Sequence, residues 1–325
     1  MDAQAFFRAR LAPLSGKYAG VLTPEAELGR PKVGVSDFLL GRAEEYFTRF
    51  VNYDYIYGTL LGECNRLGIR LEGVAVDIGS GFGNTVIPLL QNHAGLSVIA
   101  TDISPDLLAI LLREATARGA RERCAAVALN AHEEYLAPQS VDMAFGNAVL
   151  HHLADPLRAV ANVLKALKPG GRAVFCEPFQ PGHSILYMAY DRVLAEAELR
   201  RERMGPGMRF LRDIARDIHV RAHQKVLPDT GMAWEELDDK WLFTKTHFER
   251  IAEKLQCANV EVRPQYVKED MVAGHTANIL RDYGQLEQSA LPDWAWRVLR
   301  RFDEDFLTPE LKQEFVLEGI VTITR

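Results

Sequence analysis

The chain has 325 residues, of which 48% are hydrophobic and 25% are charged, as in ordinary globular proteins. Its formal net charge of -6 and its pI of about 5.9 exclude the overall basic field that attracts nucleic acid. No run approaches the ~18 apolar residues of a membrane span, there is no secretory leader and the cysteines are unpaired, so we expect a cytoplasmic protein without a membrane partner.

The first part of the chain predicts helices and the next part predicts a parallel sheet. Residues 1–72 read mainly as helix and are expected to form an N-terminal helical cap. Over residues 73–180, β-rich runs alternate with amphipathic segments, which is typical of an α/β core with helices on both faces of a parallel sheet. Ser104 and Asp155 are suited to cap two of these helices, 105–118 and 156–168. The expected strands are 74–78, 97–102, 125–129, 141–145 and 172–178.

Beyond residue 180 the alternation of strand and helix stops. Residues 181–256 are predominantly helical and are expected to form an insertion that covers the acceptor as a lid. Residues 257–325 are expected to supply the last two strands, 258–267 and 315–325, around a helical insertion at 268–314. Two terminal strands after a parallel sheet favour a hairpin that closes one edge.

A glycine loop follows the first strand of the α/β core, in "VAVDIGSGFGNTV" at 74–86. Strand, tight turn and helix are expected there, because glycine is needed where backbone approaches a ligand closely. A nicotinamide-dependent oxidoreductase is one hypothesis for such a loop. The dinucleotide fingerprint needs a third glycine where Asn84 stands, and no Tyr-x-x-x-Lys pair lies near the sheet, so both observations argue against it.

Five ordered elements resemble the class I S-adenosylmethionine-dependent methyltransferases over roughly residues 73–180. "DIGSGFG" at 77–83 matches the family's DxGxGxG loop, and "ATDIS" ends the second strand with an acid. They are followed by "NA" at 130–131, "FGNAVLHHLADP" at 145–156 and "LKPGGRAVFCEP" at 167–178. The resemblance implies a seven-stranded, doubly wound, Rossmann-like sheet with an antiparallel last strand, and S-adenosylmethionine as the cofactor.

The resemblance also implies a set of cofactor-binding residues. Asp77 would lie near the ammonium group, and Asp102 would accept hydrogen bonds from both ribose hydroxyls. The adenine-reading position usually holds an acid in the family, whereas here Asn130 would accept from the adenine amine through its amide oxygen. Asn84 and Thr85 are expected either to touch the cofactor or to cap the following helix. The full set is Asp77, Gly79, Gly81, Gly83, Asp102, Ile103, Asn130, Ala131 and Asn147.

Three residues are candidates for acid–base work on the acceptor, namely His151, His152 and Glu177, in that order. The family often carries a histidine pair at the reactive end of the cofactor, where one ring orients or deprotonates the acceptor. The alternative for each histidine is a buried ring bonded to a backbone carbonyl. For Glu177, at the carboxyl end of the fifth strand, a structural salt link is the alternative to substrate contact.

Other clusters favour plainer interpretations. His219 and His223 lie four residues apart, but the general-base glutamate of a zinc motif and a third ligand are missing, so no metal is expected. Arg209, Arg212 and Arg216 alternate with acids at pairing distance, which favours a solvated face over an anion clamp. A run of aromatic residues is expected either to cover the crevice as a lid or to pack between helices; it comprises Tyr46, Phe47, Phe50, Tyr53, Tyr55 and Tyr57.

These observations favour a methyltransferase that acts on a small, partly hydrophobic acceptor by in-line displacement at an oxygen, nitrogen, sulfur or carbon nucleophile. A protein acceptor and a non-enzymatic cofactor-binding module are the alternative hypotheses. No nucleic-acid acceptor is expected, because the "NPPY"-type tetrapeptide of base-modifying relatives is absent. A homodimer through the inserted helices is compatible with the sequence.

Overall fold

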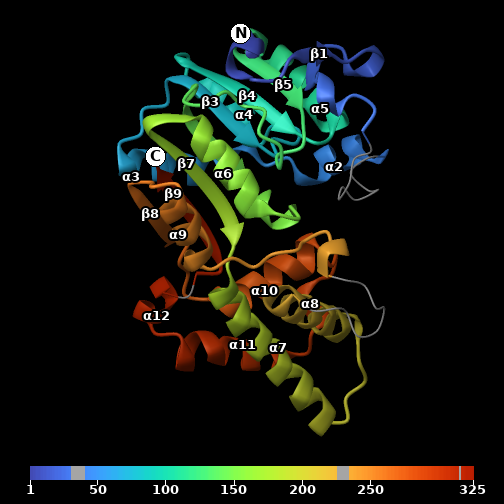
Figure 1. Cartoon of the computed structure of the whole chain (residues 1–325). Helices are drawn as coiled ribbons and strands as arrows, with labels where there is room; N and C mark the ends of the chain where they lie inside the picture. The colour runs from blue at the N-terminus through green and yellow to red at the C-terminus, as the bar shows by residue number, and fades with distance from the viewer. Residues whose placement is uncertain (31–40, 225–233, 315) are drawn as a thin grey trace. The chain divides into compact units, whose positions relative to one another are not determined.

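The computed structural model describes residues 1–30, 41–224, 234–314 and 316–325 (Figure 1). The chain divides into two compact units. The first comprises residues 1–177, 245–262 and 320–325, and the second comprises residues 178–244 and 263–319. Parts of the predicted helical cap, of the helical insertion and of the last strand, at 31–40, 225–233 and 315, lie outside the described residues.

A nine-stranded sheet runs through the chain in the order β1-β2-β5-β4-β3-β6-β7-β9-β8 (Figure 1). Neighbouring strands from β2 to β7 pair in parallel, whereas β1 is antiparallel to β2. The backbone N–H of Gly170 donates to the carbonyl of Arg325, and the backbone N–H of Arg325 donates to the carbonyl of Gly171. These bonds show that β9 is antiparallel to β7. The strands are β1 Leu11–Pro13, β2 Val21–Pro24, β3 Gly73–Ile78, β4 Leu96–Asp102, β5 Cys124–Ala128, β6 Val141–Asn147, β7 Leu167–Pro178, β8 Asn259–Pro264 and β9 Glu318–Thr324.

The predicted α/β class with an antiparallel last strand is confirmed, but the sheet has two more strands than predicted. The difference lies in the first thirty residues, where the prediction of helix is wrong: β1 and β2 form a hairpin, and Val21 and Leu22 of β2 pair with Ala126 and Val127 of β5. The segment carries short helices at Ala3–Phe6, Gly16–Tyr18 and Glu25–Glu27. Its strands are only three and four residues long, too short for an alternating pattern to be recognised.

Helices cover both faces of the sheet in the first unit. Alternate residues of the central strands pack with α3, α4 and α5 in one apolar core, while α6 and α9, which contact each other, lie in front of the sheet in Figure 1. Ser104 and Asp155 cap α5 and α6 as predicted, and α6 ends at Ala166, two residues early, because β7 begins at Leu167. The helices are α2 Ala43–Phe50, α3 Tyr53–Leu67, α4 Val86–Asn92, α5 Pro105–Ala117, α6 Pro156–Ala166 and α9 Lys245–Lys254.

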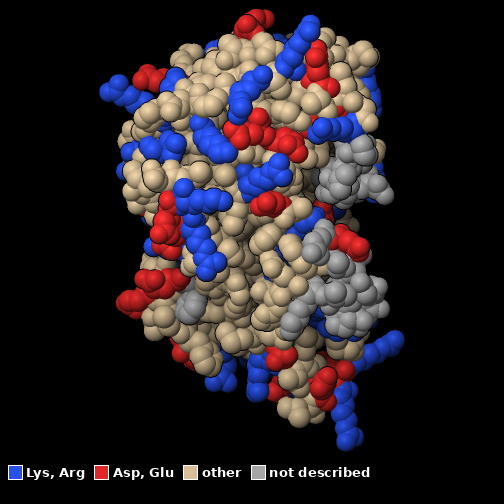
Figure 2. All heavy atoms as spheres, viewed as in Figure 1, with Lys and Arg blue, Asp and Glu red and all other residues tan. Residues whose placement is uncertain are grey.

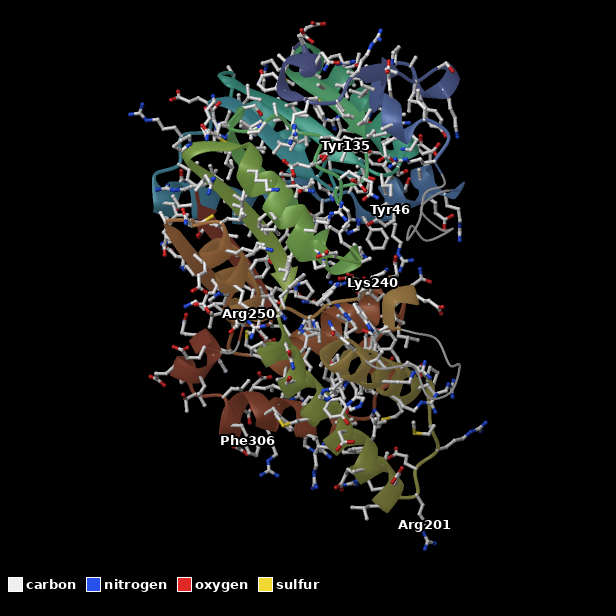
Figure 3. All side chains as sticks on the ribbon, viewed as in Figure 1. Tyr46, Tyr135, Arg201, Lys240, Arg250 and Phe306 are labelled. Carbon is white, nitrogen blue, oxygen red and sulfur yellow. The ribbon has the colours of Figure 1, made fainter. Side chains whose placement is uncertain are left out.

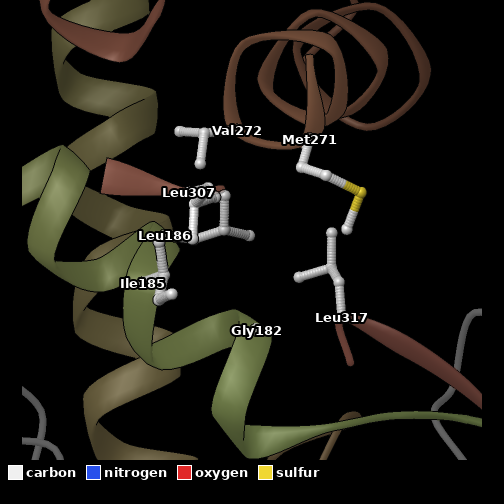
Figure 4. A pocket seen from close by; sticks show the side chains of 7 residues that line it. All are labelled: Gly182, Ile185, Leu186, Met271, Val272, Leu307 and Leu317. Atoms are coloured by element: carbon white, nitrogen blue, oxygen red, sulfur yellow. The ribbon is translucent and has the colours of Figure 1, made fainter. Parts of the chain in front are cut away.

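The second unit is helical and has its own apolar core. Asp303 is buried and caps α10, because its carboxylate oxygens accept from the backbone N–H groups of Val272 and Ala273 at 2.8 and 2.9 Å. A small apolar cavity in this core lies between Leu186, Val272 and Leu317 (Figure 4). The elements are α7 Gln180–Leu199, α8 Pro206–His223, α10 Met271–Asp282, α11 Asp293–Arg301, the π-helix Phe302–Phe306 and α12 Pro309–Glu314.

Charged side chains of both signs are interspersed on the face shown in Figure 2, in keeping with the small net charge. Among the described residues, no helix combines the length and the apolar content needed to cross a membrane. On α8, the rings of His219 and His223 lie 4.6 Å apart, with His223 exposed.

Candidate active site

The glycine loop follows β3, and its glycines 79, 81 and 83 all have positive φ. A Cβ built on Gly79 would lie 2.1 Å from Cγ2 of Val149, in the loop after β6, so only glycine fits there. Gly81 differs, because a Cβ built on it would meet no described residue within 4 Å. With respect to the described part of the chain the space beside Gly81 is therefore open, and ligand atoms can approach the backbone of the loop at this point.

Asp102, at the end of β4, holds the open part of this loop. Its Oδ2 accepts a hydrogen bond from the backbone N–H of Gly81 at 2.8 Å, and its Oδ1 accepts one from Ser104 N–H at 2.8 Å. The side chain is half-buried. A carboxylate offers about four lone-pair sites, and these two backbone groups use two of those of Asp102.

Asp77 lies one strand away, in β3, and is 1% exposed. Its Oδ1 is buried without a hydrogen-bond partner among the described residues. Burial raises the pKa of the Asp77 carboxyl to about 7, and the negative charge of Asp102 raises it in the same direction. An unpaired buried carboxylate oxygen is costly, and a cationic ligand group would satisfy it. Together, Asp77 and Asp102 suit a ligand that carries both a cation and hydroxyls.

The aromatic residues of α2 pack on the glycine loop. Phe82 is buried within the loop, and its ring centroid lies 5.6 Å from that of Tyr46, which is labelled in Figure 3, and 5.2 Å from that of Phe47. Tyr53 and Tyr57 pack instead against the main core. The aromatic set left open by the sequence thus divides: its α2 members pack on the glycine loop, Tyr53 and Tyr57 serve helix packing, and Tyr55 is exposed.

Asn84 connects this cover to the loop. Its Oδ1 accepts from the backbone N–H of Asn52 at 2.9 Å, and its Nδ2 donates to the backbone carbonyl of Phe50 at 3.0 Å. Thr85 occupies the N-cap position of α4, but its side chain makes no capping hydrogen bond. Asn84 therefore holds the α2–α3 connection over the glycine loop, a role that differs from the predicted helix cap, while its contact with the cofactor stays a prediction.

The segment after β5 contains Asn130 and Ala131. The Asn130 amide oxygen accepts from the backbone N–H of His132 at 3.0 Å and also contacts His132 Nδ1 at 2.9 Å. The Ala131 carbonyl accepts from Asn162 Nδ2 at 3.1 Å. The amide oxygen of Asn130 is thus used within its own loop, in contrast to the predicted acceptance from the adenine amine.

Glu177 organises the loop that follows β6. Its Oε1 accepts from the backbone N–H groups of Val149 and Leu150 at 3.0 and 2.8 Å, and its Oε2 accepts from His151 N–H at 3.3 Å. The His151 ring contacts the same Oε2 through Nδ1 at 2.7 Å. Because a carboxylate only accepts, Nδ1 carries the proton and Nε2 is the basic nitrogen of the neutral ring. Glu177, 1% exposed, therefore positions His151 and does not take the predicted substrate contact.

The sheet brings most of the predicted residues to one edge, because β3 to β7 are parallel and end together. Ile103 is half-buried directly after Asp102, and Asn147 lines a small cavity with Leu60 of α3. The rings of His151 and His152 lie 4.1 Å apart, with His152 the more exposed. This edge of the sheet carries Asp77, Asp102, Asn130, Asn147 and Glu177.

Sequence reasoning missed three contributors. Phe82 was not predicted because the loop motif is defined by the glycines on either side of it. His132 was not predicted because it lies outside the matched motif. An Asn-x-His spacing is a usable signal, because asparagine often accepts from the backbone two residues on. Ala148 has φ of 52°, a strained value for a residue with a side chain, and no sequence signal marks it.

Comparison with known proteins decides the class of this site. A family described as "Methyltransferase domain" matches residues 76–173, which include the carboxyl ends of β3, β4, β5 and β6 and the first part of β7. The chain carries a methyltransferase domain at residues 76–173. This match favours the methyltransferase hypothesis over the nicotinamide-dependent oxidoreductase.

Relatives of the methyltransferase domain match over part of their length. A demethylmenaquinone methyltransferase from Thermus thermophilus is 33% identical over 124 residues, which are 37% of this chain and 55% of that protein. An uncharacterized methyltransferase from Mycobacterium tuberculosis is 35% identical over 97 residues, which are 30% of this chain and 36% of that protein. The chain thus spans about half or less of these relatives.

Over most of its length, the chain is similar in fold to a solved methyltransferase. A Haemonchus contortus phosphoethanolamine N-methyltransferase, in complex with S-adenosyl-L-methionine, aligns with a TM-score of 0.50 at 19% identity. The alignment covers 91% of this chain and 60% of that protein. At this identity the likeness concerns the fold alone.

Proposed function

We propose that the chain transfers a methyl group from S-adenosylmethionine to a small-molecule nucleophile. The observation that carries the proposal is the pairing of two acids at the glycine loop. Asp102 is held by the Gly81 N–H, and Asp77 has a buried oxygen that no described residue hydrogen-bonds. A ligand with ribose hydroxyls and a cationic end matches both acids.

The cofactor would lie along the carboxyl ends of β3 to β6. Asp77 would face its ammonium group, Asp102 its ribose and residues 130–131 its base, with the loop glycines allowing close backbone approach. Ile103 and Asn147 would border it. When bound, S-adenosylmethionine supplies an electrophilic methyl group on a sulfonium sulfur. The aromatic cover formed by Tyr46 and Phe47 on Phe82 would help to exclude water from the loop.

His151 would act on the acceptor. Its Nδ1–H donates to Glu177, which fixes the ring orientation and directs basicity to Nε2. An acceptor hydroxyl, thiol or amine would lose its proton to this nitrogen as the nucleophile attacks. The larger part of the rate would come from holding donor and acceptor in line, since transfer needs no covalent intermediate.

The acceptor class is supported by the names of the relatives. Besides the demethylmenaquinone methyltransferase, a ubiquinone/menaquinone biosynthesis C-methyltransferase from Marinomonas is 24% identical over 180 residues, 51% of this chain and 70% of that protein. Both names refer to quinones, whose reduced quinol forms are aromatic, carry ring hydroxyl groups and can act as nucleophiles. We therefore propose an aromatic acceptor of this type, with the ring carbon or a ring hydroxyl as nucleophile.

The proposal is tested by methyl transfer in solution. Purified protein is incubated with S-adenosylmethionine that carries a labelled methyl group and with a panel of demethylated quinones, phenols, amines and a bulk protein acceptor. We expect label in one class of small aromatic molecule, with equimolar formation of S-adenosylhomocysteine. Label only in protein would contradict the small-molecule acceptor. Absence of binding by both S-adenosylmethionine and S-adenosylhomocysteine in calorimetry would contradict the cofactor.

A further inference from the structure

The orientation of the Asn130 amide is determined by its neighbours. The backbone N–H of His132 lies 3.0 Å from Asn130 Oδ1. A backbone N–H can only donate, so the atom facing it must be the amide oxygen and not the NH₂ group. The two ends of this side chain are therefore distinguished by a fixed donor.

The protonation of the His132 ring is determined in the same way. The backbone N–H of Asp155 lies 3.1 Å from His132 Nε2, so Nε2 must accept. The proton of the neutral ring is then on Nδ1, which lies 2.9 Å from Asn130 Oδ1 and donates to it. Burial lowers the pKa of His132, which favours this neutral form. Asn130 Oδ1 consequently accepts two hydrogen bonds, one for each of its lone pairs.

The loop that carries both residues is anchored on two sides. On one side, the backbone N–H of Arg8 donates to the carbonyl of Tyr135 at 2.8 Å, and the Tyr135 hydroxyl donates to Glu27 (Figure 3). On the other side, α6 donates to the Ala131 carbonyl through Asn162. The segment 130–135 is thus held before any ligand arrives, and so is the direction of the Asn130 amide.

We infer that Asn130 recognises the base of the cofactor as a hydrogen-bond donor, through Nδ2, and that His132 is the positioning residue that imposes this direction. The inference rests on the proposed function, because it assigns the base to this loop. Nδ2 has no partner among the described residues, whereas Oδ1 is saturated. In adenine the exocyclic N6 is the only donor and the ring nitrogens are acceptors, so a group that can only donate must bind a ring nitrogen.

The first test exchanges Asn130 for the acid that the resemblance leads one to expect. Asn130→Asp keeps the acceptor for His132 but removes the donor, and it places a carboxylate against a ring-nitrogen lone pair. We expect the Kd of S-adenosylhomocysteine, measured by calorimetry, to rise at least about 10-fold, as when a good hydrogen bond is replaced by a mismatch. An unchanged or lower Kd would mean that residue 130 accepts from N6, and the inference would be wrong.

The second test identifies the atom that Asn130 reads. S-adenosylhomocysteine is compared with its 1-deaza, 3-deaza and 7-deaza analogues, each of which replaces one ring nitrogen by C–H. For the wild type, we expect one analogue to bind at least about 10-fold more weakly than the parent compound. In Asn130→Ala that same difference should fall below about threefold. If Asn130→Ala changes the affinity of no analogue relative to the parent compound, Asn130 does not donate to a ring nitrogen.

The third test concerns His132 through a matched pair of variants. Asparagine and leucine have similar shapes, but His132→Asn can donate an amide N–H in place of Nδ1–H, whereas His132→Leu cannot. In His132→Leu only the backbone N–H of residue 132 still donates to Asn130 Oδ1. We therefore expect His132→Asn to keep the deaza sensitivity and His132→Leu to reduce it, with similar thermal midpoints for the two. Equal deaza sensitivity of the two variants would show that His132 does not position Asn130. Failure of the parent compound to bind the wild type would instead contradict the proposed function, so the two failures are distinguishable.

Discussion

The Oδ2 atom of Asp102 accepts a hydrogen bond from the backbone N–H of Gly81 at a distance of 2.8 Å. This bond joins the end of β4 to the open part of the glycine loop across twenty-one residues of sequence. The same carboxylate accepts from Ser104 at the start of α5. One side chain therefore sets the positions of two backbone segments that border the proposed cofactor.

The first prediction follows from this bond. Asp102→Ala removes the acceptor for Gly81 and the proposed acceptor for the ribose, and we expect S-adenosylhomocysteine affinity to fall about 100-fold, the effect of two charge-assisted hydrogen bonds. Asp106→Ala is the matched control, because Asp106 lies in the first turn of α5 and pairs with Lys17 instead. Calorimetry on both variants measures the effect. Equal affinities for the two would show that the glycine loop does not bind the cofactor through Asp102.

The second prediction concerns pH and Asp77. The carboxyl has a pKa of about 7 because it is buried, and a cationic ligand prefers its ionised form. Protonation at lower pH removes that form, so we expect S-adenosylhomocysteine to bind about tenfold more weakly at pH 6 than at pH 8. Asp77→Asn should bind weakly and without this dependence. A wild-type affinity that is flat over this range would mean that Asp77 does not face the cation.

The third prediction separates two glycines of the loop. Gly79→Ala places a methyl group against Val149, at a backbone φ of 63°, and should lower the free energy of unfolding by about 3 kcal/mol. Gly81→Ala meets open space and should cost about 1 kcal/mol, for its φ of 51° alone, while reducing cofactor affinity more strongly. Chemical denaturation measures the stabilities. Adding Val149→Ala to the Gly79→Ala variant should restore part of the lost free energy of unfolding. If the double variant is no more stable than Gly79→Ala, the cause is not the contact with Val149.

The fourth prediction addresses the His151–Glu177 pair. In Glu177→Gln the amide NH₂ opposes the His151 Nδ1–H, so the ring adopts the other tautomer and Nε2 loses its basic lone pair. For an acceptor that must lose a proton, we expect kcat to fall about 100-fold while the cofactor Kd changes less than threefold. His152→Ala, in the same loop, should reduce kcat less than His151→Ala does. The opposite order would identify His152 as the base.

The sheet could be predicted from the sequence because the signals of its strands and of the helices between them are local. The central strands are buried on both faces, and the caps Ser104 and Asp155 mark helix starts by residue type alone. The two added edge strands could not be predicted in this way, because β1 and β2 become strands only by pairing at the edge beyond β5.

The motifs predicted which residues stand at the site, but they did not predict what each residue does there. Glu177 and Asn130 were correctly placed at strand ends, yet their functions depend on Val149, Leu150 and His132, whose backbone N–H groups come close only after folding. A motif records which residue stands at the end of a strand. It does not record whether the acceptor atoms of that residue are already used by the protein.

The last prediction concerns the stability of the helical unit. Two histidines there are held in the neutral form: burial lowers the pKa of His183 to about 3 and that of His275 to about 4, and their rings lie 6.2 Å apart. Positive charge on Arg221 also lowers the pKa of His183, with Asp239 opposing it, and Lys268 lowers that of His275. His183 Nδ1 donates to the backbone carbonyl of Phe179.

Because the pKa of each histidine is lower in the folded chain than the usual value near 6.5, the unfolded chain binds more protons below pH 6.5. The two histidines therefore leave the free energy of unfolding unchanged well above pH 6.5 and lower it as the pH falls from there towards their folded pKa values, by at most about 1.4 kcal/mol per pH unit for each histidine. Denaturation of the full chain between pH 4.5 and 7 measures this slope. His183→Asn, whose amide can still donate to Phe179, should have a shallower slope than the wild type, because titrating carboxylates act equally on both. Identical slopes for the two proteins would show that His183 is not held neutral by the fold.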